Sequence, residues 1–189
     1  MARQIKIGLV TVAAGVVLII AFAARRTESA KDEFRFDAAK LKDGATWIQV
    51  NAKPYLISSI VATDCRAPIA IDVESQRKRN PHAESYITVY VNKAGRDAMF
   101  AKDVQRFPEG SIIVKEKIGT HLEGGKPLLY TLMKKREPGY NPKVGDWEFS
   151  VVGPDGKQLQ AIGKLENCES CHKHKSDSDF VFRPYLNSN

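Results

Sequence analysis

Five short runs rich in β-branched and aromatic residues, each bounded by turn residues, constrain the fold of this chain most strongly. Such runs are typical of β-strands. The last of them is followed by Gly153-Pro-Asp-Gly, a sequence that favours a tight hairpin turn. We therefore predict strands at residues 47–50, 86–91, 111–118, 128–134 and 147–152.

Helical signals are weaker and few. The best candidates are residues 71–79 and 94–104, the second of which carries Met99, Phe100 and Val104 at helical spacing. Because the predicted strands do not alternate regularly with helices, the pattern favours antiparallel pairing over β–α–β units. We expect a small α+β domain, mainly antiparallel β with a few helices, and 43% hydrophobic residues among 189 are enough to build its core.

A C-x-x-C-H motif lies near the C-terminus, where Cys168 and Cys171 are followed directly by His172. This spacing is typical of covalent haem attachment, in which two thiols bond the haem and the adjacent imidazole is the proximal iron ligand. The sequence thus predicts one haem c. Three alternatives stay open: a thioredoxin-like redox pair, a zinc site that also uses His174, and a structural disulfide.

The opposite side of such an iron would decide the function, because a sixth ligand favours electron transfer and an open position admits small molecules. Side chains of suitable type are Met99, Met133, His82, His121 and His174. Each of them taken singly is more typical of core or surface positions than of ligation. The third cysteine, Cys65, is expected to be a buried free thiol, with an intermolecular disulfide as the alternative.

The N-terminus combines a basic start with an uncharged stretch, residues 7–24, that ends before Arg25 and Arg26. This pattern predicts a signal peptide or a signal anchor at residues 1–26, followed by a polar linker at 27–45 and the main domain at 46–189. Either form of the N-terminal segment would place the domain in the periplasm or on the outer face of the cytoplasmic membrane, the anchored form as a transmembrane protein.

The formal charge of +7 comes from scattered lysines and arginines. Solvated loops account for such scatter, and a docking face for an acidic redox partner is the functional alternative. No nucleic-acid-binding motif is present, so we do not expect a nucleic-acid partner.

Four segments together resemble the cytochrome P460 family, which includes the cytochrome c′-beta proteins. The resemblance covers about residues 80–186. It rests on Phe107-Pro-Glu-Gly-Ser-Ile-Ile-Val-Lys115, Gly145-Asp-Trp-Glu-Phe149, the C-x-x-C-H motif and Ser178-Asp-Phe-Val-Phe182. It implies a mainly antiparallel β fold, a homodimer, and a five-coordinate haem with His172 as the proximal ligand. Trp147, Phe149, Phe180 and Phe182 would then pack near the haem, while Asp177 and Asp179 are expected as surface acids or a helix cap.

The resemblance implies two different activities. The P460 enzymes oxidise hydroxylamine to nitrogen oxides and pass electrons to a cytochrome partner, whereas the c′-beta proteins bind nitric oxide or carbon monoxide in an apolar pocket. In the enzymes a lysine at the position of Lys115 is covalently joined to the haem ring. Strand alternation by itself predicts a solvated Lys115.

The hydroxylamine-oxidising members of the family resemble one another in having a distal carboxylate, which could act as a general base. The corresponding residues of this chain, 128–134, contain no Asp or Glu, and Tyr130 is the only polar aromatic residue among them. We expect Tyr130 to be a half-buried strand residue. The missing acid favours gas binding or electron transfer over oxidation, so an oxidoreductase, a gas-binding protein and a simple electron carrier all remain open.

Overall fold

A computed structural model describes residues 36–57, 85–103, 106–119 and 126–187 of the chain. The predicted signal peptide or anchor at 1–26, the predicted helix at 71–79, Cys65, His82 and His121 lie outside these residues. Among the described residues, no helix has both the length and the apolar character needed to cross a membrane.

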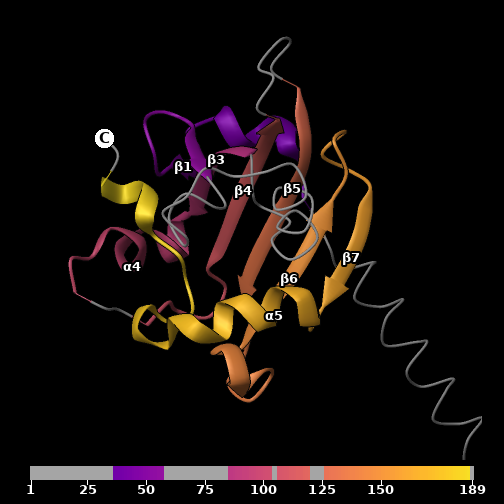
Figure 1. Ribbon diagram of the computed structural model, residues 1–189. Coiled ribbons are helices and arrows are strands. Elements are labelled where there is room, and N and C mark those ends of the chain that lie inside the picture. Colours follow the sequence, from indigo (N-terminus) through magenta and orange to yellow (C-terminus); the bar gives the residue numbers. More distant parts are fainter. Residues whose placement is uncertain (1–35, 58–84, 104–105, 120–125, 188–189) are drawn as a thin grey trace, which may run out of the picture. The chain divides into compact units, whose positions relative to one another are not determined.

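The described part of the chain forms one antiparallel sheet in the order β1-β3-β4-β5-β6-β7, with β2 also paired to β3 (Figure 1). Neighbours along β3 to β7 are consecutive in the chain, so short connections give antiparallel pairing. The strands are β1 Trp47–Gln49, β2 Tyr55–Ile57, β3 Ser85–Asn92, β4 Ile112–Gly119, β5 Pro127–Lys135, β6 Trp147–Val152 and β7 Leu159–Gly163.

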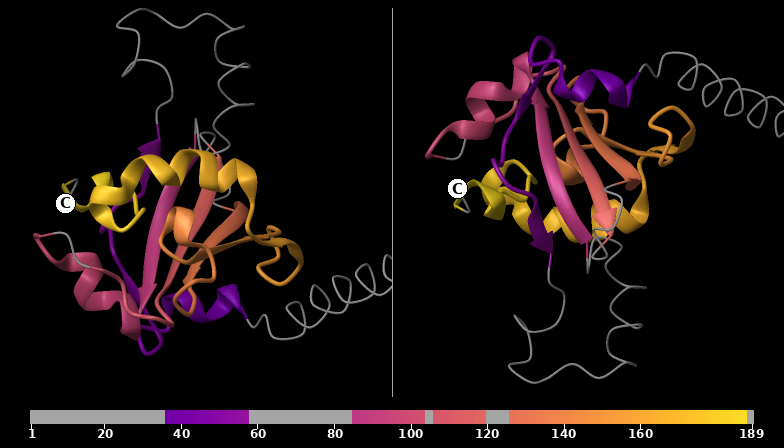
Figure 2. Two further views of the ribbon diagram at one scale, coloured as in Figure 1. Left: turned by 90° about the horizontal axis from the view of Figure 1, so that it is seen from below. Right: turned by 90° about the horizontal axis from the view of Figure 1, so that it is seen from above.

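The helices are short, and most are single 3-10 turns. Two are α-helical: α4 Arg96–Phe100, and α5 Glu166–His172, which runs across one end of the strands (Figures 1 and 2). The 3-10 turns are η1 Ala38–Lys42, η2 Lys93–Gly95, η3 Pro142–Val144, η4 Lys173–Ser178 and η5 Pro184–Asn187.

The prediction of a mainly antiparallel β domain is confirmed, and all five predicted strands are present within two residues of their expected ends. The predicted helix at 94–104 is shorter than expected, because only Arg96–Phe100 is α-helical. Sequence analysis missed β2, β7 and α5. The first two are short edge strands, and α5 lacks an apolar stripe of helical period.

The hydrophobic core lies against the face of the sheet that α5 covers. Because side chains alternate along a strand, Val89, Ile113, Met133 and Phe149 point to this face from four neighbouring strands. Trp147, at the start of β6, is completely buried in the same cluster.

Part of the segment predicted as a linker, 27–45, is folded. The ring of Phe36 packs edge-on against Tyr130 and Trp47, with ring centroids 5.6 Å and 6.4 Å apart. Asp37 caps η1, and Leu41 within that turn is buried. Residues 36–42 of this segment are therefore packed against the face of the sheet opposite α5.

Candidate haem-binding site

The C-x-x-C-H motif forms the last five of the seven residues of α5. Residues three and four positions apart lie on one face of a helix, so Cys168, Cys171 and His172 share a face. His172 is buried, Cys168 is half-buried and Cys171 is exposed, and both thiols are free. This arrangement presents two thiols and one imidazole to the same region, with one thiol at the surface.

The imidazole of His172 is held in one orientation by its neighbours. Its Nδ1 lies 2.6 Å from the carbonyl oxygen of Phe180, and since a carbonyl can only accept, Nδ1–H is the donor. The ring packs between those of Phe149 and Phe182, with centroids 5.2 Å and 5.1 Å away. Nε2 is therefore the nitrogen left to bind a ligand.

The electrostatic environment keeps His172 neutral. Burial, followed by the positive charge of Lys115, lowers its pKa to about 4, and the Phe180 carbonyl opposes both effects. A neutral imidazole with its Nδ1 proton fixed has a lone pair on Nε2, which is the form that ligates iron.

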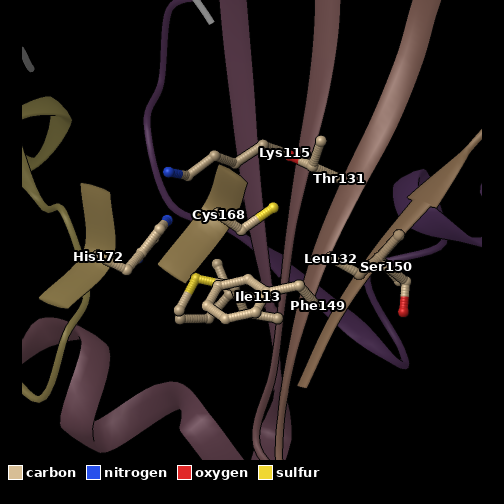
Figure 3. A pocket seen from close by; sticks show the side chains of 9 residues that line it. Ile113, Lys115, Thr131, Leu132, Phe149, Ser150, Cys168 and His172 are labelled. Atoms are coloured by element: carbon tan, nitrogen blue, oxygen red, sulfur yellow. The ribbon is translucent and has the colours of Figure 1, made fainter. Parts of the chain in front are cut away.

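A pocket opens between α5 and the central strands, in front of His172 (Figure 3). Its wall includes the apolar side chains of Ile113, Met133 and Phe149 from β4, β5 and β6, together with Cys168 from α5. Apolar walls with a few polar groups are typical of cofactor sites. The pocket thus joins the motif on α5 to the central strands.

Lys115 reaches this pocket from β4, and the prediction of a solvated side chain is wrong. Only 7% of Lys115 is exposed, and burial lowers its pKa to about 8, with Cys168 opposing the shift. Alternation places it on the same face as Ile113, and α5 covers that face. Lys117, two residues on, is also buried, and burial lowers its pKa to about 8.

The other candidate ligands are dispersed. Met133 lines the pocket, Met99 is buried in the core, and His174 is exposed. Within the described ranges, no group of three or more His, Cys, Asp and Glu side chains is arranged to hold a metal ion, so the four residues of the zinc alternative do not form such a group.

Tyr130 is on the face of the sheet opposite the pocket, and it is buried where we predict a half-buried residue. Burial, followed by the charge of Glu116, raises its pKa to about 12. Glu116 is itself buried and accepts a hydrogen bond from the Tyr90 hydroxyl at 3.2 Å. Sequence analysis missed Glu116, which faces away from the pocket because it alternates with Lys115 along β4.

Asp179 is buried, so its prediction as a surface acid is wrong, but it is the C-cap residue of η4, in agreement with the cap alternative; Asp177 is exposed as predicted. The Asp179 carboxylate forms an ion pair with Lys135 at 2.6 Å and accepts a hydrogen bond from the backbone N–H of Phe107 at 2.8 Å. No local pattern marks this pair, because its two members are 44 residues apart in the chain.

Gly145 packs directly against the residue that orients His172. Its φ is 64°, and a Cβ there would lie 2.6 Å from the Phe180 ring and 2.9 Å from the Asp179 carboxylate. We expect Gly145→Ala to lower the free energy of unfolding, measured by denaturant titration, by about 1–2 kcal/mol for the left-handed backbone and by roughly 1–3 kcal/mol more for the overlap.

Gly139→Ala is the matched control for this prediction. Gly139 also has a positive φ, 89°, but no described atom lies within 4 Å of its Cβ position. Equal losses in the two variants would contradict the packing role of Gly145.

These features fit a haem with its iron on His172: Nε2 faces an apolar pocket, Nδ1 is fixed, and the two thiols lie on the same helix face. The same features do not fit a thioredoxin-like redox pair, which is expected near a β–α–β unit. Here the motif ends a helix that follows an antiparallel sheet, and the described chain has no β–α–β unit around it.

Comparison with known proteins identifies a family for this chain. The family described as Cytochrome P460 matches residues 69–183, which is more than half of the chain. A search of curated proteins finds no match. The matched range includes Lys115, both cysteines and His172. The chain belongs to the cytochrome P460 family of haem-binding cytochromes.

Proposed function

We propose that this protein is an exported c-type cytochrome that binds hydroxylamine or nitric oxide at its haem iron and oxidises it. One observation carries the proposal: the thiol of Cys168, the imidazole of His172 and the amine of Lys115 all line the same pocket. Lys115 belongs to β4, which is far from the motif in the chain. The fold, and not the motif alone, therefore brings its amine to the pocket that Cys168 and His172 line.

Cys168 and Cys171 would hold a single haem through two thioether bonds, and His172 would hold its iron through Nε2. The helix supports both roles, because it sets the thiols and the imidazole on one face. When bound, haem supplies an iron atom that takes a small ligand and exchanges electrons one at a time. Phe149 and Phe182 keep the His172 ring in place and exclude water from it.

Lys115 is suited to the covalent bond with the haem ring that occurs in P460 enzymes. A bond from Nζ to a ring carbon would replace one N–H and one C–H bond and would release two protons and two electrons, so it would need an added two-electron oxidant such as a peroxide. The amine must also be neutral, because only then does it have a free lone pair. Burial lowers the pKa of Lys115 to about 8, so much more of its amine is neutral near neutral pH than in a solvated lysine. Its Nζ lies 5.8 Å from the centroid of the Phe182 ring, which also packs against His172.

The proposal includes export of the domain, a cytochrome as redox partner and a homodimer. The predicted N-terminal signal would bring the domain to the periplasm or to the outer face of the cytoplasmic membrane, where a cytochrome could accept its electrons. Cys171 is exposed, so the proposed attachment site reaches the protein surface, as electron transfer to a partner requires. A homodimer is proposed from the family resemblance alone.

The Lys115→Ala variant tests the proposed bond between Lys115 and the haem ring. We expect the variant to keep its covalent haem while the absorption spectrum shifts toward that of an unmodified c-type haem, because the bond to the ring is lost. Tryptic mass spectrometry of the wild type should show the Lys115 peptide joined to the haem peptide. Lys134→Ala, on the neighbouring strand, is the control and should leave the spectrum unchanged. Identical spectra for wild type and Lys115→Ala would exclude the cross-link.

Gas binding is a second candidate, and a specific observation favours it. No Asp or Glu is found among the described residues that line the pocket, so none of them supplies a carboxylate to take protons from a bound substrate. In this case the protein would bind nitric oxide or carbon monoxide without turnover. Steady-state consumption of hydroxylamine with an electron acceptor separates the two, because only the oxidase consumes it.

A further inference from the structure

The turn formed by Asp179 and Phe180 is fixed by several polar contacts. The Asp179 carboxylate accepts from Lys135 and from the Phe107 backbone, and the Asp179 carbonyl accepts from the indole N–H of Trp147 at 2.8 Å. Three separate parts of the chain therefore hold this turn in place.

The ion pair at the centre of this arrangement is shielded from water. The side chains of Lys135 and Asp179 are 5% and 7% exposed, and the Lys135 ammonium also lies 4.9 Å from the Trp147 ring centroid. Removing either partner of a pair buried this deeply would leave the other charge uncompensated at a high cost in free energy, so each side chain fixes the position of the other.

The backbone of the turn needs such support. Asp179 and Phe180 both have positive φ values, 49° and 64°, which side-chain-bearing residues rarely adopt. Gly145 leaves room for the turn, since any Cβ at that position would overlap the Phe180 ring. An unfavourable backbone conformation of this kind is kept where the surrounding contacts determine it, and such places are often functional.

This conformation aims the Phe180 carbonyl at the imidazole of His172. The Phe180 carbonyl points at Nδ1 of His172 at 2.6 Å, while the Phe180 N–H donates to the Lys175 carbonyl. A strong acceptor at Nδ1 fixes the ring orientation and makes the opposite nitrogen a better electron donor.

We infer that the Lys135–Asp179 ion pair is a positioning device that sets the strength of His172 as an iron ligand, acting through the Phe180 carbonyl. The inference rests on the proposed function, in which Nε2 of His172 holds the haem iron. Lys135 and Asp179 do not touch the proposed ligand nitrogen and act only by holding the turn. Loss of the pair should lengthen the Nδ1–H···O bond and weaken electron donation from the imidazole to the iron.

The test uses the ferrous holoprotein and measures the iron–histidine stretching vibration by resonance Raman spectroscopy. We expect a lower frequency in Asp179→Asn, in Lys135→Met and in the double variant, with a higher haem midpoint potential in the same proteins. The double variant carries no unpaired buried charge, so an uncompensated charge cannot account for a shift in its iron–histidine frequency. Asp177→Asn, an exposed acid two residues away, is the control and should match the wild type.

The outcomes separate the inference from the proposed function. A wild-type protein that shows no iron–histidine vibration would overturn the proposed ligand, and the inference with it. A wild-type vibration that stays at the same frequency in the double variant would overturn the inference alone, even if that variant unfolds more easily. Such a result would leave the ion pair a purely structural role.

Discussion

Replacing both Cys168 and Cys171 by serine, in a chain that also carries Lys115→Ala, is expected to abolish covalent haem attachment. Serine hydroxyls do not form the thioether bonds that the two thiols would form, although His172 would still be present to ligate iron. The intact mass measured under denaturing conditions should therefore fall to that of the bare polypeptide, whereas the wild type should carry one haem.

Ser170→Ala provides a matched control on the same helix. Ser170 lies between the two cysteines, is exposed, and bonds through its hydroxyl only to the Asn167 carbonyl among the contacts of the described chain. This variant should keep the full haem mass. A double-serine variant in the Lys115→Ala background that retains haem after denaturation would refute the proposed attachment. A haem-free wild type with a Cys168–Cys171 disulfide would instead support the redox-pair alternative.

Asp179→Ala is expected to lower the free energy of unfolding by about 3–5 kcal/mol, a large part of the stability of a small domain. The change leaves the buried Lys135 ammonium without its partner and also removes the acceptor of the Phe107 N–H. Both losses are costly because the groups are shielded from water. Denaturant titration of the holoprotein, followed by far-ultraviolet circular dichroism, measures the change.

Two further variants test the cause of this loss. Asp177→Ala, at an exposed position, should change the free energy of unfolding by less than about 0.5 kcal/mol. Adding Lys135→Met to Asp179→Ala should recover part of the stability, because the unpaired charge is then gone. If Asp179→Ala costs no more than Asp177→Ala, the ion pair does not stabilise the fold.

Much of the sheet could be predicted because the strand signal is local. The runs that form β3, β4, β5 and β6 are long, apolar and bounded by turns, and this pattern survives any arrangement of their neighbours. β2 and β7 are short strands at the periphery of the sheet, and their pairing depends on adjacent strands more than on their own residues. The helix α5 could not be predicted because its residues follow no apolar stripe.

The same distinction applies to the site. Cys168, Cys171 and His172 are close together in the sequence, so their spacing alone indicates chemistry whatever the fold. Alternation alone predicts a solvated Lys115, because it identifies two faces of a strand without saying what covers each. The burial of Asp179 could not be predicted from the sequence either, since its partner Lys135 lies on β5, far from it in the chain.

By itself, the sequence determined a mainly antiparallel domain, its membership of the cytochrome P460 family and the position of a C-x-x-C-H motif, because each is encoded in residues that are near one another in the chain. Only the tertiary structure decided that Lys115 faces the motif, that Tyr130 and Glu116 face away from it, and that Lys135 and Asp179 support the residue that orients His172. These relationships depend on which face of the sheet α5 covers, and that is settled by packing between segments far apart in the chain.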